Sequence, residues 1–329
     1  MRSIKKAAAL SVLSIALPLG SCGGVGFDSP ELVKTLRVLA VQKDTPYAHP
    51  GDKVSLRMLY WDGKAEEGSP RDVQIFFSDC VNPPADLYYR CFSPNSTLAP
   101  PDPPTGAPMP DADHVALHTF TLPPDIVSSR PPAPGTHAYG LGYVLFTVCA
   151  GKVGPVPQAG QTSLPLGCFA ADGSKLGVDD FDPGYTSIYA YDDGRTNANP
   201  VIHGFTLRNP EISLEPDADG VRHIARCIPG ACPKLEFKVD IDRASAEPDP
   251  GASDLDGRPV SEQLWISYYK TRGDIEKSQR LVNDATRGWN DDNATTWTPP
   301  PVPGMARLWG IVHDNRGGVE WVEAKISVE

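Results

Sequence analysis

The sequence is short of histidine, methionine and positive charge, and these shortages narrow the possible functions. It has seven histidines and four methionines, and 41 acidic residues outnumber 30 Lys and Arg residues, for a formal net charge of −11. A chain this acidic lacks the positive surface that attracts nucleic acids and anionic membrane surfaces. We therefore expect no nucleic-acid partner.

Several motifs that carry chemistry are also missing. The sequence contains no Gly-x-Ser-x-Gly elbow, no His-Glu-x-x-His pair and no Gly-rich phosphate-binding loop. His114 and His118 are four residues apart, but four residues of an extended strand span about 13 Å, which is too far for one metal ion. We therefore predict a protein without enzymatic activity, cofactor or metal.

Long hydrophobic runs are rare, and the most prominent one lies at the N-terminus. Residues Ala7 to Leu19 are mostly apolar, with Arg2, Lys5 and Lys6 before them and small residues after them. The run is shorter than the roughly 20 residues that a membrane-spanning helix needs. A basic start, a short apolar middle and a small-residue end are typical of a secretory signal peptide.

The end of this signal is more specific. Leu19-Gly20-Ser21-Cys22 resembles the lipobox of bacterial lipoproteins. The resemblance implies cleavage before Cys22, a diacylglyceryl group on its sulfur and, usually, an acylated new amino terminus. Gly23 is not the Asp that would imply retention at the inner membrane, so the resemblance implies an outer membrane lipoprotein. The alternative is an ordinary cleaved signal with an unrelated cysteine.

This interpretation assigns the N-terminal region. We predict a signal peptide over residues 1–21, lipid attachment (palmitate or a related acyl chain) at Cys22, and a tether over residues 22–34. Loss of the signal removes three basic residues and shifts the formal net charge from −11 to −14. No second apolar run approaches the length of a membrane span, so the lipid is the expected membrane anchor. Display on the periplasmic or the cell-surface face stays open.

Six cysteines remain once Cys22 is assigned to lipid. An exported protein would oxidise them to disulfides. Six cysteines allow many pairings, and sequence alone does not choose among them, although their order suggests that neighbours pair. A zinc site is the alternative, but the closely spaced pair Cys227 and Cys232 has no second pair of Cys or His ligands to complete it. The candidates are Cys80, Cys91, Cys149, Cys168, Cys227 and Cys232.

Composition and periodicity both favour β-structure. The chain has 35 prolines and 30 glycines, which suit strands joined by turns better than helices. Alternation is clear in Lys234–Asp242, where Leu235, Phe237, Val239 and Ile241 share one face, and Val54–Trp61 shows much the same pattern. Such strands belong to antiparallel sheets with one solvated face. The polar, turn-forming segment Asp192 to Pro200 separates two groups of strands.

A family resemblance refines the fold. Ala306 to Glu329 resembles the last hairpin of a bacterial immunoglobulin-like or PKD-type domain, with Asp314 to Gly318 as its turn. We therefore predict an all-β protein with two tandem immunoglobulin-like β-sandwich domains, over residues 35–195 and 199–329. Trp265 stands where such folds often bury a tryptophan. The second domain's cysteines both precede Lys234–Asp242, so the inter-sheet disulfide of antibodies cannot form there.

Exposed loops are the expected recognition elements. Aromatic side chains on loops can stack on sugars or anchor a protein partner, and the candidates are Tyr88, Tyr89, Trp289 and Trp297. The proline-rich stretches Ser93 to Asp113 and Pro123 to Gly135 favour extended conformations suited to display, or are plain solvated insertions. Acidic residues cluster in three turns, at residues 179–182, 215–219 and 249–256, but none completes a calcium-binding loop.

These observations lead to one functional hypothesis and one alternative. We predict a lipid-anchored cell-envelope protein that acts as a non-enzymatic binding, adhesion or scaffolding module. Its partner would be a protein or a polysaccharide of the envelope. The alternative is a polysaccharide-binding protein or a hydrolase accessory domain of the envelope.

Overall fold

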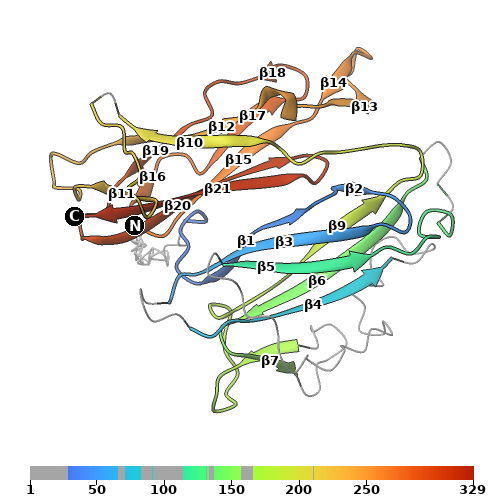
Figure 1. The fold of residues 1–329 in the computed structure, drawn as a ribbon, viewed down its shortest axis with the longest axis horizontal. Helices are drawn as coiled ribbons and strands as arrows, with labels where there is room; N and C mark the ends of the chain where they lie inside the picture. Colours follow the sequence, from blue (N-terminus) through green and yellow to red (C-terminus); the bar gives the residue numbers. More distant parts are fainter. Residues whose placement is uncertain are drawn as a thin grey trace, which may run out of the picture.

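A computed structural model describes residues 29–65, 71–82, 91, 114–130, 132, 137–156, 166–209 and 211–329. Within these ranges the chain forms β-strands and short 3-10 segments, among them Arg243–Ser245, with no α-helix (Figure 1). The all-β prediction is confirmed. No helix of the described residues is long and apolar enough to span a membrane. The signal peptide, Cys22, Tyr88, Tyr89 and the stretch Ser93 to Asp113 lie outside the described residues.

The first sandwich contains two facing sheets and a small hairpin. One sheet has the order β1-β3-β5, the other has the order β2-β9-β6-β4, and β7 pairs with β8. All neighbouring strands are antiparallel except β2 and β9, which are parallel. The strands are β1 (Leu36–Lys43), β2 (Tyr47–Ala48), β3 (Lys53–Asp62), β4 (Gln74–Val81), β5 (Val115–Thr121), β6 (Gly140–Cys149), β7 (Lys152–Pro155), β8 (Leu166–Phe169) and β9 (Phe181–Ala190).

The second sandwich is larger. One sheet has the order β10-β12-β19-β16, the other has the order β11-β21-β20-β15-β17-β18, and β13 pairs with β14. The strands are β10 (Ile202–Arg208), β11 (Val221–Ile224), β12 (Leu235–Ile241), β13 (Pro248–Ser253), β14 (Pro259–Ser261), β15 (Leu264–Lys270), β16 (Asp274–Ile275), β17 (Gln279–Asp284), β18 (Gly288–Trp289), β19 (Thr295–Thr298), β20 (Gly304–Asp314) and β21 (Val319–Val328).

Both sandwiches share the strand arrangement of an immunoglobulin-like domain. In each sandwich, the first two strands belong to different sheets. In the first sandwich β1 pairs with β3 and β2 pairs with β9. In the second sandwich β10 pairs with β12 and β11 pairs with β21. The pairing of β2 with β9 and that of β11 with β21 are both parallel. The orders β1-β3-β5 and β9-β6-β4 correspond to strands A-B-E and G-F-C of the immunoglobulin fold.

Alternating apolar residues fill the core of each sandwich. In β12, Leu235 and Phe237 are 0% exposed, and they face the buried side of β15 and β20. Gly310 of β20 allows the two sheets to approach closely, because a Cβ atom there would lie 2.5 Å from Val239 Cγ2. Leu56 and Val54 of β3 occupy the corresponding core of the first sandwich. The amphipathic pattern of the sequence therefore places these side chains as expected.

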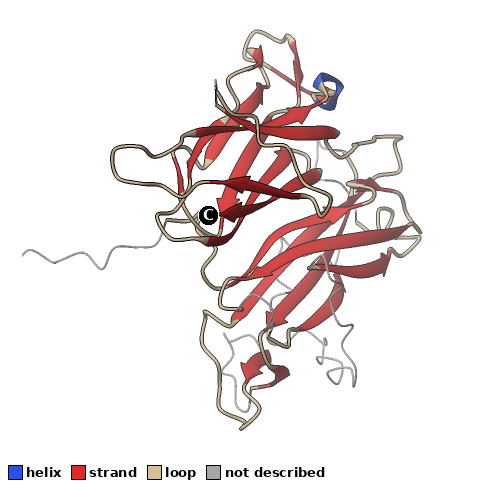
Figure 2. Cartoon of the chain, turned by 60° about the vertical axis from the view of Figure 1, so that its left-hand side comes forward, coloured by secondary structure: helices blue, strands red, loops and turns tan. Residues whose placement is uncertain are grey.

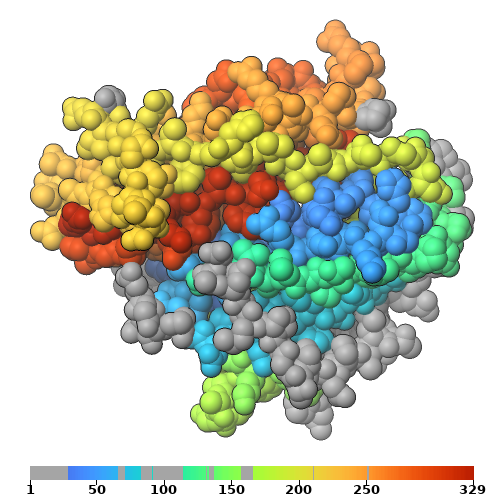
Figure 3. All heavy atoms as spheres, viewed as in Figure 1, coloured from blue at the N-terminus to red at the C-terminus, as the bar shows by residue number. Residues whose placement is uncertain are grey.

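The two sandwiches pack face to face, which the sequence did not predict. Leu59 of β3 meets Trp309 and Ile311 of β20, and the exposed fractions of these residues are 2%, 1% and 0%. They form an apolar core between the domains, which we call the interdomain core. The expectation of a solvated second face holds for Lys53, Ser55 and Arg57 of β3, but it is wrong at Leu59, where the second sandwich covers that face. Figures 1 and 2 show the resulting stack of sheets, and Figure 3 shows the atoms of both sandwiches in contact along this boundary.

Polar contacts cross the same boundary near the turn between β20 and β21. Gln42 of β1 donates from Nε2 to the carbonyl oxygen of Val319, over 2.7 Å. Asn199 donates to the carbonyl oxygen of Lys43 at 2.6 Å and accepts from the amide of Val319 at 2.9 Å. The segment that joins the domains is thus hydrogen-bonded to both of them.

Residues 29–34, which we call the N-terminal strap, lie against the second sandwich. Leu32 forms a parallel bridge with Lys270 at the end of β15. The amide of Val33 donates to the carbonyl oxygen of Lys270 at 2.8 Å, and the amide of Lys270 donates to that of Glu31 at 2.9 Å. Val33 is 2% exposed and belongs to the interdomain core. The last six residues of the expected tether are therefore part of the packed body.

Candidate functional site

The structure joins the six paired cysteines as neighbours along the chain. The Cα atoms are 5.9 Å apart in Cys80–Cys91, 5.5 Å apart in Cys149–Cys168 and 4.2 Å apart in Cys227–Cys232. Each bond closes a short loop, which is the stapling role that the order of the cysteines suggests.

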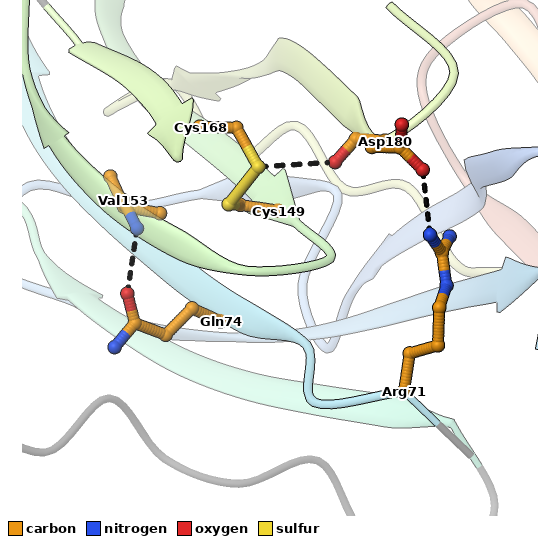
Figure 4. Close-up of a disulfide and its surroundings, with 6 residues drawn as sticks. All are labelled: Arg71, Gln74, Cys149, Val153, Cys168 and Asp180. Carbon is orange, nitrogen blue, oxygen red and sulfur yellow. Dashed lines mark hydrogen bonds and ion pairs between the residues drawn. A yellow bond between two sulfur atoms is a disulfide. The ribbon is translucent and has the colours of Figure 1, made fainter. Parts of the chain in front are cut away.

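The Cys149–Cys168 bond lies beside a network of charged side chains (Figure 4). Arg71 donates to Asp180 at 2.7 Å and binds Asp62 through two nitrogens. Burial opposes ionisation of Asp180, but hydrogen bonds from Arg71 and Lys64 hold its pKa below the ordinary value. This carboxylate of the first aspartate cluster therefore stabilises the fold as part of an ion-pair network.

The other aspartate clusters have similar structural roles. The carboxylate of Asp217 accepts from the amides of Asp219 and Val221, and that of Asp254 accepts from the amides of Asp256 and Arg258. Both arrangements stabilise turns. Across the part of the chain that the structure describes, no three His, Cys, Asp or Glu side chains are grouped to hold a metal ion.

The two histidines of strand β5 and its start take separate positions. His118 Nε2 lies 2.7 Å from Asp79 Oδ1, and its ring stacks on Phe77 with centroids 4.6 Å apart. The ring of His114 lies instead against Trp61, with centroids 4.5 Å apart. Each is held by its own aromatic neighbour.

Two predictions about tryptophans are wrong: the exposure of Trp297 and the burial of Trp265. Trp297 is 0% exposed and donates from Nε1 to the carbonyl oxygen of Arg272 at 3.0 Å, so it is a core residue that no ligand can reach. Trp265 is only partly buried and stacks on His313, while Trp297 and Trp309 are the fully buried tryptophans of the second sandwich. Trp289 is partly exposed, with the guanidinium of Arg243 5.6 Å from its ring centre.

A cavity of about 610 Å³ opens where the two sandwiches meet the segment that joins them, and we call it the interdomain cavity. The first sandwich contributes Tyr47 of β2 and the nearby His137. The joining segment contributes Asp193–Thr196. The second sandwich contributes Glu247–Asp249 at the start of β13 and Arg316 from the turn between β20 and β21.

Contacts among its own side chains hold one wall of this cavity in place. Arg316 donates from Nη2 to Glu247 at 2.9 Å and from Nε to Glu262, which is fully buried. The guanidinium lies 5.7 Å from the centre of the Tyr47 ring, and that ring packs against Tyr191 with centroids 4.8 Å apart. Burial raises the pKa of Glu262 to about 7, even though Arg316 opposes this shift.

The opposite wall is built from the joining segment. Asp193 accepts from Arg195 Nε at 3.0 Å and lies 3.5 Å from His137 Nδ1. Gly194, between Asp193 and Arg195, has a φ of +78°, a conformation that glycine adopts without steric cost. The cavity therefore combines an aromatic ring, two guanidinium groups and several carboxylates whose positions are fixed by neighbours.

Sequence reasoning missed this cavity because its parts are far apart in the chain. Its residues come from positions between 47 and 316, and each is unremarkable in its local sequence. The available signal was the polar joining segment, which we interpreted only as a domain boundary. Only the packing of the two domains brings these residues together.

Comparisons with known proteins find no matching protein-family model and no matching curated protein. Among solved structures, Escherichia coli alpha-2-macroglobulin activated by porcine elastase aligns with 92% of this chain at 10% identity and a TM-score of 0.23; the chain spans 22% of that protein. The N-terminal Ig1-2 module of the Drosophila receptor tyrosine phosphatase DLAR aligns with 90% of this chain and 99% of its own, at 10% identity and a TM-score of 0.21. The Yersinia pseudotuberculosis adhesin InvE aligns with 88% of this chain and 58% of its own, at 8% identity and a TM-score of 0.18. Similarity at this level gives no information on function.

Proposed function

We propose that this chain is a lipid-anchored outer membrane protein that acts as a non-enzymatic binding module of a bacterial cell envelope. The lipobox at Cys22 supports the anchor, and the disulfide-forming cysteines support export to an oxidising compartment. The immunoglobulin-like sandwiches support a binding role only weakly, because sandwiches carry many functions.

The observation that carries the binding role is the interdomain core. Two domains that served only as a spacer would need no apolar contact between their faces, yet Leu59, Trp309 and Ile311 are almost completely buried there. This packing holds the two sandwiches together, and both contribute walls to the interdomain cavity. A preorganised surface loses less conformational entropy when it binds a partner.

Crosslinking in living cells, followed by identification of the crosslinked neighbours, tests this function. The wild-type chain should incorporate labelled palmitate, partition with membranes and crosslink reproducibly to envelope components. Cys22→Ala should lose the label and the membrane partitioning. Equal palmitate uptake by Cys22→Ala would show that the lipobox interpretation is wrong.

The non-enzymatic part has its own test. Purified protein should release no products from envelope polysaccharides. Turnover that disappears on a single carboxylate substitution would establish the hydrolase alternative instead.

A further inference from the structure

We propose that the interdomain cavity binds a neutral oligosaccharide. The inference rests on the proposed function, since it names the ligand class of that binding module. Three features of the cavity carry it: its size and rigidity, its balance of charge, and its aromatic wall.

The size and construction of the cavity suit a small ligand or a segment of a polymer. Its volume of about 610 Å³ lies within the roughly 300–1,000 Å³ that is typical of ligand sites. Both sandwiches and the segment between them contribute walls, and the interdomain core fixes their relative position. The site is therefore present before any ligand arrives, which favours binding.

Four of the five Arg, Asp and Glu side chains that line the cavity are already paired with each other. Arg316 binds Glu247 and Glu262, and Arg195 binds Asp193. A charged ligand would compete with one of these pairs and leave its former partner uncompensated. A hydroxyl group donates and accepts, so it can donate to a carboxylate or accept from a guanidinium without displacing either. Sugars carry such hydroxyls at close spacing and without net charge.

Tyr47 supplies the remaining element of a saccharide site. Tyr47 lines the cavity, and its ring is supported by Tyr191 at 4.8 Å and by the guanidinium of Arg316. Aromatic side chains with one apolar face and one polar end bind ligands of mixed character. The C–H groups on one face of a pyranose ring form the flat apolar surface that such a ring accepts.

The position of the cavity agrees with binding to an extended polymer. The strap pairs with Lys270, which lies opposite Leu308 on β20, whereas Arg316 follows the other end of that strand. Leu308 and Asp314 are six residue steps apart along β20, or about 20 Å. The cavity therefore lies away from the strap, on the side that an anchored chain would present to its surroundings.

Calorimetric titration of the full-length lipoprotein, in a detergent without sugar groups, tests this inference. The probes are four neutral tetraoses, namely cellotetraose, maltotetraose, mannotetraose and chitotetraose. Tetragalacturonate and chitosan tetraose serve as anionic and cationic probes of equal length. We expect at least one neutral tetraose to bind, and both charged probes to bind at least tenfold more weakly.

Two variants locate the binding in the cavity. Thr196→Trp fills the cavity from an exposed position, and Tyr47→Leu removes the aromatic ring but keeps apolar volume. Each should weaken binding at least tenfold, whereas Trp289→Leu, a partly exposed aromatic outside the cavity lining, should stay within twofold of the wild type. Thr196→Trp decides the result if Tyr47→Leu folds poorly.

The inference is overturned if no neutral tetraose binds, if a charged probe binds as tightly, or if Thr196→Trp binds like the wild type. Crosslinking in cells separates this failure from failure of the proposed function. If no tetraose binds while Thr196→Trp keeps the wild-type crosslinked neighbours, only the saccharide site is wrong. If the wild-type chain has neither palmitate label nor envelope neighbours, the proposed function itself is wrong.

Discussion

Leu59→Ala tests whether the two sandwiches are one structural unit. Leu59 is 2% exposed, and its contacts in the interdomain core are with residues of both domains, including Trp309 and Ile311. Replacing a buried leucine by alanine costs the transfer free energy of the lost groups plus that of the cavity left behind, about 3 kcal/mol in total. With a urea slope of about 3 kcal/mol/M, the midpoint of unfolding should fall by about 1 M.

Tryptophan fluorescence during urea unfolding, without reductant, measures this effect. Trp309 and Trp61 lie in or against the interdomain core, so their emission reports its opening directly. Leu56→Ala removes a leucine from the first sandwich's own core and should cost a similar amount, while Leu117→Ala, at a position 64% exposed, should change stability by less than about 0.5 kcal/mol. If Leu59→Ala behaves like Leu117→Ala, that face of β3 is solvated and the packing argument is refuted.

Three further predictions follow from buried groups. Burial lowers the pKa of Lys43 to about 8, below its value in the unfolded chain. Stability should therefore rise by on the order of 2–3 kcal/mol between about pH 8 and the unfolded-state pKa near 10.5. Lys43→Met should remove this rise in urea titrations at pH 7.5 and 9.5. Arg316→Met leaves Glu262 buried without its ion-pair partner, so it should lower the free energy of unfolding by about 3–5 kcal/mol. The control Arg243→Met, which breaks an exposed pair with Asp291, should lower it by less than about 1 kcal/mol in the same assay. The double variant Cys149→Ser, Cys168→Ser removes a disulfide between cysteines with a sequence separation of 19 residues, and it should lower the free energy of unfolding by about 3 kcal/mol. Equal stability of this variant and the wild type in calorimetry would contradict the stapling role.

Strand positions could be predicted from the sequence because local alternation decides which face of a strand is apolar. Lys234–Asp242 illustrates this, since its four apolar residues all enter one core. Short strands without a pattern of their own, such as β11 at Val221–Ile224, could not be predicted. Their pairing depends on a partner about one hundred residues away, here β21.

The interdomain core had a sequence signal that half-buried strands do not show. Leu308 to Val312 is an uninterrupted apolar run, which is typical of strands buried on both faces. Leu308 and Val312 enter the core of the second sandwich, while Trp309 and Ile311 enter the interdomain core. In β3, Leu59 follows Met58 in the same way. Such runs indicate that both faces of a strand are buried, but they do not identify the part of the protein that covers the second face.

Trp297 shows the opposite limit. It lies in a polar stretch between Asn293 and Pro299, which favours an exposed loop, yet β19 places it in the core. The carbonyl oxygen of Arg272 satisfies its indole N–H there. This hydrogen-bond partner lies 25 residues away in the chain, and nothing in the neighbouring sequence indicates that contact.

The N-terminal strap determines how the protein would carry mechanical load. Tension on an anchored chain first reaches residues 31–33, whose backbone is bonded to Lys270 of the second sandwich, before the chain enters the first sandwich at β1. The buried pair of Glu31 and Lys270, with Nζ and Oε1 3.6 Å apart, strengthens that junction. If the chain is anchored at its N-terminus as proposed, both sandwiches would be connected to that anchor in parallel, so a pull on the distal end would not have to pass through the joining segment.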